Sequence, residues 1–516
     1  IRNAHYPQDP AFMDACDELG LFVIVNTPGW QFWNNAPSFE QLVYSDIRNM
    51  VRRDRNRPSI WLWEPILNET WYPDTFALNT KKIVEAEMAG GNSYTSSDLQ
   101  AKGSEHFPVI FTYPMDEKDM DPNKNYYTRE WGDNVDDWNS HNSPSRVHRS
   151  WGEKPMLVQA MHYSNPLYSY ISYNSLYKTS SQHMGGALWH SFDHQRGYHP
   201  DPFYGGIMDA YRQPKYSYQM FKAQRSPEKT AIIAETGPMV YIANEMTPFS
   251  GSDVVVFSNC DEVKLKVFKN GKEFIHKKDK AEKGMPSPPI VFKDVYHFLD
   301  IKALHRNKKE REAYLVVEGL MNGKVVATDT VRSALRPEKI VLSIDNEGVD
   351  LKADGSDFVT VIAAVTDKQG NVKRLNNSII KFEISGEGSI IGDEAFIANP
   401  KQLNWGTAPI LVQSSTNPGT ITIKASMFYK GTLKPIAGEI TLNSVPTNDV
   451  LLYDKRELEA KKDNKLISSE KSSNSVNNKI EIELKKVKKE LHDLKLKTVE
   501  KQQEEFGEKS KEDRLD

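Results

Sequence analysis

Apolar and polar positions in the first 225 residues follow the patterns of helices and strands that alternate along the chain. Apolar residues at helical spacing predict helices over residues 10–20, 38–52 and 74–89. Short apolar runs predict buried strands over residues 21–25, 60–63, 108–112, 155–158 and 185–189. This order predicts an α/β domain, with a parallel sheet or barrel and crossover helices. The predicted strands are too few to close an eight-stranded barrel.

The pattern changes near residue 226 to short alternating runs separated by turns. Two units, residues 226–336 and 337–447, each have the size and pattern of an immunoglobulin-like β-sandwich. In the first unit, Asn270-Gly271 closely follows a predicted strand and predicts a hairpin. Residues 448–516 are rich in Lys, Glu, Ser and Asn, which predicts a charged tail that is partly helical or disordered. A short coiled-coil stripe runs from Ile480 to Leu494.

Composition narrows the possible partners. A formal net charge of −4 gives no global attraction to nucleic acid, and no apolar run is long enough to span a membrane. The only two cysteines, Cys16 and Cys260, are too few for a disulfide framework. Nine of the ten tryptophans lie between Trp30 and Trp189, which suits either a carbohydrate site or a large core. The chain opens without an initiator Met or an apolar leader, so we expect it to begin inside a domain.

Glu69 is the first candidate for chemistry. It follows the apolar run 60–63 and Asn68, and (β/α)₈ barrels place catalytic groups just past the ends of their buried strands. Asn68 is predicted to bind a substrate hydroxyl while Glu69 donates a proton. Three nearby tryptophans are predicted to give Glu69 the apolar setting that a general acid requires, namely Trp61, Trp63 and Trp71. The alternative is that Glu69 is a surface acid of a loop.

Glu130 is the second candidate, because glycoside cleavage uses a pair of carboxyl groups. It follows the β-prone run Tyr126–Thr128 and precedes Trp131-Gly132. Arg129 and Asp133 are predicted to hold its charge and orientation. The alternative is a structural ion pair between Glu130 and Arg129 or another arginine.

The histidines predict no metal site, since neither HExxH nor CxxC occurs among them. His190 and His194 follow the predicted strand 185–189, where they either line the mouth of a pocket or are structural. No glycine-rich phosphate loop and no GxSxG motif is present.

Several motifs taken together resemble glycoside hydrolase family 2, the family of β-galactosidases and β-glucuronidases. They are IRNAHYP (1–7), CDELG (16–20), DRNRPSI (54–60) with Asn68-Glu69, GGALW (185–189), GGIMD (205–209) and RQPK (212–215). The resemblance covers residues 1 to about 330 and continues in looser form to about 445. It implies a partial TIM (β/α)₈ barrel over residues 1–225, preceded in the family by a jelly-roll domain, a sandwich domain and the first barrel strands.

The resemblance also implies a function and a set of residues. We expect a retaining exo-β-glycosidase of the β-galactosidase type, with no cofactor and a periplasmic or extracellular location. Glu69 is expected to be the acid/base and Glu130 the nucleophile. The glycone pocket is expected to be lined by His5, Asn68, Tyr113, Trp189 and His190. From charge alone, Arg129 and Arg146 are further candidates for binding an anionic or sulfated sugar.

Three departures from the family pattern leave alternatives open. Val25-Asn26 stands where the family has an acidic dipeptide, so a metal ligand is not expected there. Glu64 lies in the acid/base signature and is a rival to Glu69. Residues 154–160 resemble the nucleophile strand but carry Gln159-Ala160 where a Glu is expected. Either the nucleophile strand is residues 126–133, or the protein is a non-catalytic carbohydrate-binding protein with a degenerate barrel.

Overall fold

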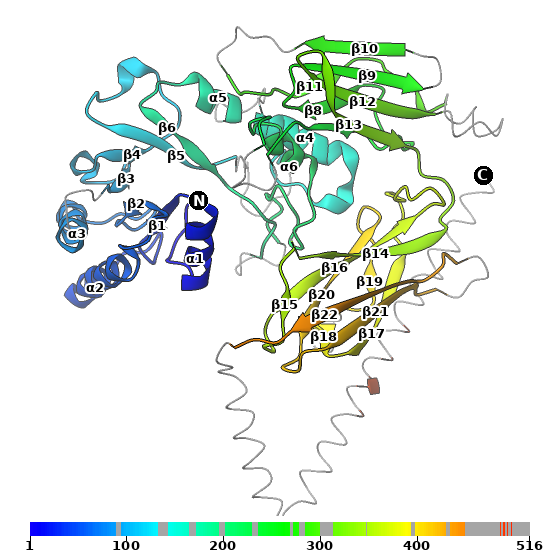
Figure 1. The fold of residues 1–516 in the computed structure, drawn as a ribbon. Coiled ribbons are helices and arrows are strands. Elements are labelled where there is room, and N and C mark those ends of the chain that lie inside the picture. Colours follow the sequence, from blue (N-terminus) through cyan, green and yellow to red (C-terminus); the bar gives the residue numbers. More distant parts are fainter. Residues whose placement is uncertain are drawn as a thin grey trace, which may run out of the picture. The chain divides into compact units, whose positions relative to one another are not determined.

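The computed structural model describes most of the chain in two compact units, residues 1–334 and 335–516 (Figure 1). The described residues are 1–88, 94–132, 143–164, 172–195, 202–229, 236–268, 272–277, 284–299, 313–346, 348–393, 398–429, 434–448, 486, 489–490, 493 and 497. The apolar positions of the predicted coiled-coil stripe and the Asn270-Gly271 turn lie outside these residues, and so does Asp133.

The first unit begins with an arc of parallel strands. They are β1 (Val23–Asn26), β2 (Ile60–Glu64), β3 (Ser96–Asp98), β4 (Val109–Phe111), β5 (Asn125–Trp131) and β6 (His183–Leu188). β1 pairs with β2, and β3, β4, β5 and β6 form a second parallel sheet in that order. Single parallel bridges connect Arg2 to Ile24 and Trp63 to Thr95, so the arc continues through both sheets. The carboxyl ends of all these strands therefore lie at the same end of the arc.

Helices connect and cover these strands, and the first three of them confirm the predicted helices. They are α1 (Pro10–Leu19), α2 (Pro37–Asp54), α3 (Asp74–Glu87), α4 (Glu153–Ser164), α5 (Tyr173–Lys178) and α6 (Tyr216–Lys222). At α1, the Asp9 carboxylate accepts a hydrogen bond from the Ala11 amide, and Gly20 ends the helix with φ of 67°, a conformation that glycine adopts without steric cost. Buried side chains of α1, α2 and α3 pack on β1 and β2 in one apolar core.

Residues 155–158 were predicted as a strand, and this prediction is wrong. They lie in helix α4, where Pro155 occupies the first turn, the one part of a helix that tolerates proline. Met156, Ala160 and Tyr163 are buried at helical spacing. The assignment of residues 154–160 as the nucleophile strand is therefore wrong as well, and the absence of a Glu at Gln159-Ala160 no longer argues against a nucleophile elsewhere.

The rest of the first unit is built from antiparallel strands. They are β7 (Val240–Ala243), β8 (Val254–Ser258), β9 (Glu262–Phe268), β10 (Lys272–Lys277), β11 (Ile290–Phe292), β12 (Tyr314–Met321) and β13 (Lys324–Arg332). They form one sheet in the order β10-β9-β12-β13 and another in the order β11-β8-β7. One core contains buried residues of both sheets, including Val254, Leu265 and Leu315. β9 and β10 pair antiparallel on either side of the predicted hairpin turn.

The second unit is a separate β domain with its own core. Its strands are β14 (Lys339–Asp345), β15 (Leu351–Lys352), β16 (Phe358–Thr366), β17 (Ile379–Gly386), β18 (Gly388–Ile390), β19 (Lys401–Gln402), β20 (Thr407–Ser414), β21 (Thr420–Met427) and β22 (Gly438–Val445). They form two sheets, in the orders β14-β16-β20-β18 and β15-β22-β21-β17-β19. In the described part of the chain, no helix is long and apolar enough to cross a membrane.

Candidate active site

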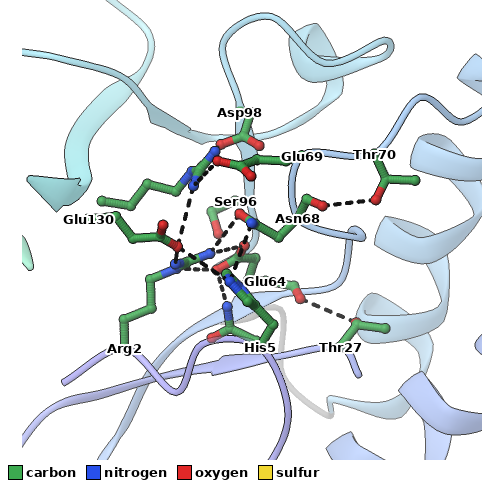
Figure 2. Close-up of polar contacts among 12 residues, drawn as sticks. Arg2, His5, Thr27, Glu64, Asn68, Glu69, Thr70, Ser96, Asp98 and Glu130 are labelled. Carbon is green, nitrogen blue, oxygen red and sulfur yellow. Dashed lines mark hydrogen bonds and ion pairs between the residues drawn. The ribbon is translucent and has the colours of Figure 1, made fainter. Parts of the chain in front are cut away.

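The carboxyl ends of β1, β2, β3 and β5 place a cluster of charged side chains in one region, shown in Figure 2. Arg2, at the bridge beside β1, lies at its centre with only 2% of its side chain exposed. Its Nε and Nη2 atoms donate to the two Glu64 carboxylate oxygens at 2.8 and 2.7 Å. Its Nη1 atom donates to Glu130. Arg2 thus connects the end of β2 to the end of β5.

Glu64, the rival of Glu69, is fully buried inside this network. Its Oε2 atom also accepts a 2.6 Å hydrogen bond from the Asn26 side-chain amide, and its side chain is 1% exposed. Burial raises the pKa of the Glu64 carboxyl, and the adjacent Arg2 guanidinium acts in the opposite direction. A carboxylate so enclosed and so fully hydrogen-bonded anchors Arg2 and is not placed to reach a substrate. Asn26, at the position where the family has an acid, contributes an amide donor to this anchor.

Glu69 lies at the other side of the cluster and remains accessible, with 43% of its side chain exposed. Its Oε2 atom accepts a 2.7 Å hydrogen bond from the Gln31 side-chain amide. The expected apolar setting from three tryptophans is largely absent. Trp63 is buried in the barrel core and Trp61 packs on Tyr127 and Phe22, so only Trp71 lines the same cavity as Glu69.

Arg129 links the two candidate carboxylates. Its Nη1 atom lies 3.6 Å from Glu69 Oε1 and 3.4 Å from Glu130 Oε1, while its Nε donates to Asp98 at 2.6 Å. These two Glu oxygens are therefore at most about 7 Å apart, which is compatible with the carboxyl separation of about 5–5.5 Å in retaining glycosidases. The ion pair proposed as the alternative role of Glu130 is present, and it lies within the site.

Both candidate acids have a left-handed backbone. The φ angle is 47° at Glu69 and 50° at Glu130, a region that non-glycine residues seldom occupy. Gln31, the hydrogen-bond partner of Glu69, also has a positive φ of 53°. Such strained residues concentrate at functional sites, where the surrounding contacts hold them in place.

His5 and Asn68 approach the same pair of groups. His5 Nε2 lies 3.6 Å from Glu130 Oε1 and 3.4 Å from Asn68 Nδ2, and Asn68 Oδ1 accepts from Arg2 at 3.1 Å. Burial, followed by the charges of Arg2 and Arg129, lowers the pKa of His5 to about 3. His5 is therefore neutral near pH 7, and it can hydrogen-bond a substrate hydroxyl without adding charge.

The other predicted residues are placed as follows. Tyr113, Arg129, Glu69 and Glu130 line one cavity of about 550 Å³ at the ends of β2 to β5. Trp189 stacks on His5, with ring centroids 6.1 Å apart, and His190 follows it and packs against His194 and Phe203. Arg146 is buried, with its guanidinium 4.5 Å from the centre of the Phe203 ring, and it is not one of the residues that line the cavity.

Four residues of the site were not among the sequence candidates, namely Arg2, Asn26, Gln31 and Asp98. Arg2 lies in the motif 1–7, which also contains His5, so this motif could have identified Arg2 as a site residue. Asp98 ends a strand of only three residues, Ser-Ser-Asp, whose polar composition gives no strand signal.

A strand arc with paired carboxylates at its carboxyl end is the arrangement that (β/α)-barrel glycoside hydrolases use. The model of the glycosyl hydrolases family 2 TIM barrel domain matches residues 1–228, and that of glycoside hydrolase family 2 C-terminal domain 5 matches residues 340–429. Together these matches span more than half of the chain, and the chain belongs to glycoside hydrolase family 2. Its architecture is accordingly the family's TIM barrel domain plus a C-terminal β domain.

Similar proteins carry related names. A β-galactosidase of Thermoanaerobacter pseudethanolicus is 28% identical over 453 residues, covering 83% of this chain and 55% of that protein. A β-galactosidase of Thermoanaerobacterium thermosulfurigenes is 26% identical over 420 residues, covering 76% of this chain and 54% of that protein. The chain thus spans about half the length of these curated relatives.

Solved structures show the same fold. A family 2 β-glucuronidase superposes with a TM-score of 0.61 at 20% identity, covering 87% of this chain and 45% of that one. A β-glycosidase of Bacteroides vulgatus superposes with a TM-score of 0.59 at 19% identity, covering 86% of this chain and 59% of that one.

Proposed function

We propose that this chain forms part of a retaining exo-β-glycosidase that releases terminal β-linked sugars, with Glu69 as acid/base and Glu130 as nucleophile. The observation that carries the proposal is the Arg129 guanidinium, which contacts both carboxylates at the edge of one cavity. The relatives named β-galactosidase support the reaction class and favour a β-galactoside as substrate.

In the first step, the Glu130 carboxylate attacks the anomeric carbon of the sugar. The bond from that carbon to the leaving oxygen breaks, and Glu69 donates its proton to that oxygen. In the second step, Glu69 takes a proton from a water molecule, whose oxygen attacks the same carbon and releases Glu130. Arg2 and Arg129 orient Glu130 throughout, because both donate to or face its Oε1 atom.

His5 and Asn68 are proposed to bind glycone hydroxyls beside Glu130, with Trp189 behind His5 as an apolar wall. Tyr113, which follows β4, and His190, which follows β6, are proposed to complete the glycone pocket.

The charges of the site favour a neutral sugar over an anionic one. Two guanidinium groups, of Arg2 and Arg129, face four carboxyl groups, and Arg129 donates directly to Asp98. Arg129 therefore brings no surplus positive charge for a uronic acid or a sulfate. The two-sheet β regions at 240–332 and 339–445 are each proposed to be an immunoglobulin-like sandwich.

The non-catalytic alternative was motivated by the missing Glu in residues 154–160 and by the truncated barrel. The first motive no longer holds, because residues 154–160 lie in helix α4. The test is hydrolysis of 4-nitrophenyl β-galactoside, β-glucoside and β-glucuronide by the complete protein. We expect Glu69→Ala and Glu130→Ala each to lower kcat by about 10²-fold or more. Glu105→Ala, at an exposed acid outside the cavity, serves as the matched control.

Azide separates the two roles. With Glu69→Ala, azide attacks the glycosyl-enzyme and yields the β-glycosyl azide, whereas with Glu130→Ala it attacks from the vacated face and yields the α-glycosyl azide. Full activity of Glu130→Ala would contradict the assignment.

A further inference from the structure

Trp71 is exposed to a degree unusual for its residue type. Its exposed fraction is 82%, although it follows Glu69 by only two residues and lines the cavity with Thr70 and Leu99. Trp33 and Trp61 are packed instead, Trp33 against Phe76 and Trp61 against Tyr127, and Trp30 is less exposed, at 48%. A large flat ring left in water beside a polar cavity is a surface on which a ligand can bury apolar area.

The position of Trp71 relative to the two acids indicates which part of a substrate it meets. Arg2 and His5 contact Glu130, so they belong to the side where the anomeric carbon is attacked. Thr70 and Trp71 continue the chain from Glu69, and Figure 2 shows Thr70 beyond Asn68, away from Arg2 and Glu130. Because the acid protonates the glycosidic oxygen, groups that lie beyond Glu69 on the side away from Arg2 and Glu130 are next to the leaving group.

A second partly exposed apolar side chain lines this cavity. Leu99 follows Asp98 directly at the end of β3, is 39% exposed and lines the same cavity. Gln100 and Thr112 add polar side chains to the cavity lining. An apolar surface with a few polar groups at its edge matches a pyranose ring, which has C–H faces and a rim of hydroxyls.

We propose that Trp71, together with Leu99, forms a subsite for the leaving-group sugar of a neutral β-linked oligosaccharide, with the ring stacked on the indole. This inference rests on the proposed function of Glu69 and Glu130. It makes Trp71 a specificity-determining residue that selects chains of sugars over glycosides with small leaving groups.

Two substrates with the same glycone test the proposal on the complete protein. β-1,4-Galactobiose places a sugar in the subsite, whereas β-galactosyl fluoride has a leaving group too small to reach Trp71. We expect Trp71→Ala to lower kcat/KM for galactobiose by about five- to tenfold, which is the range of a lost aromatic stacking contact. The same variant should change kcat/KM for the fluoride by less than about twofold, and Trp71→Phe should recover most of the galactobiose activity.

The matched control is Phe22→Ala, because Phe22 is 67% exposed but lies just before β1, at the opposite end of the strands. Equal losses on both substrates, or no loss on galactobiose, would overturn the subsite. A wild-type protein that does not turn over galactosyl fluoride would contradict the proposed β-galactosidase function instead. In that case titration calorimetry with galactobiose still tests the subsite, since Trp71→Ala must weaken binding and Phe22→Ala must not.

Discussion

The Arg2 guanidinium is held by Glu64 through two parallel hydrogen bonds, and this leaves its remaining nitrogen, Nη1, for Glu130. Both side chains of the pair are almost completely buried. Bidentate geometry fixes the direction of a guanidinium as well as its position. Glu64 therefore sets the orientation of the proposed nucleophile without meeting the substrate, and the two carboxylates at the ends of β2 and β5 have separate tasks.

Replacing Glu64 by Gln tests this arrangement. The variant replaces one of the two carboxylate partners of the buried Arg2 by a neutral amide, so we expect a loss of stability of about 3 kcal/mol and a lower kcat. Thermal unfolding and steady-state kinetics measure the two effects. Arg52→Gln, which breaks the exposed Arg52–Glu87 pair, is the control and should cost less than about 1 kcal/mol. An active, equally stable Glu64→Gln protein would contradict the anchoring role.

Gln31 is expected to position the acid/base. Gln31→Leu removes the 2.7 Å hydrogen bond to Glu69 Oε2 while keeping a similar side-chain volume. Leaving groups that need protonation should suffer most, so kcat/KM for a methyl β-glycoside should fall by about tenfold. The 2,4-dinitrophenyl β-glycoside leaves without proton donation and should be affected by less than about twofold. Equal effects on both substrates would show that Gln31 has no specific connection to proton transfer.

Glu153 is expected to make stability depend on pH. It begins α4, accepts hydrogen bonds from Ser250 and from the Glu245 amide, and is 5% exposed. Burial raises its pKa in the folded protein from 4.5 to about 7. The folded state therefore holds a proton that the unfolded state releases, so stability is highest below pH 4.5 for this group and falls as the pH rises to about 7.

Glu153→Gln keeps an acceptor but cannot ionise. At pH 8 we expect its Tm to exceed that of the wild type by about 2–4 °C, and at pH 5 the difference should shrink towards zero. Melting curves at the two pH values measure this. Glu228→Gln, at an exposed position, should show no such pH-dependent gain. A variant destabilised equally at both pH values would mean that the carboxyl is needed for packing.

Strand and helix order in the first 90 residues could be predicted because the apolar runs are long and end in clear signals, such as Gly20. The run Pro155–Val158 could not be assigned from four apolar residues, since a short run is equally compatible with a buried helix. Its helical spacing becomes visible only when Met156, Ala160 and Tyr163 are considered together.

For the site, the sequence distinguished Glu69 from Glu64 only through the preceding Asn68. In the structure, Glu64 differs from Glu69 because it is buried and paired with Arg2. Arg2 is 62 residues away in the chain from Glu64 and 128 residues away from Glu130. Contacts over such separations are set by the register of parallel strands, which local patterns do not encode. The same reason explains why Arg129 was predicted beside Glu130 but its contact with Glu69 was not.

Covalent trapping tests the central claim most directly. The complete protein is incubated with 2,4-dinitrophenyl 2-deoxy-2-fluoro-β-galactoside, and the labelled peptide is sequenced by mass spectrometry. A retaining mechanism with Glu130 as nucleophile predicts one fluorosugar per chain, attached to Glu130, and no label in Glu130→Gln. A label on Glu64 or Glu69, or continued turnover of galactosides with no label at all, would contradict the account.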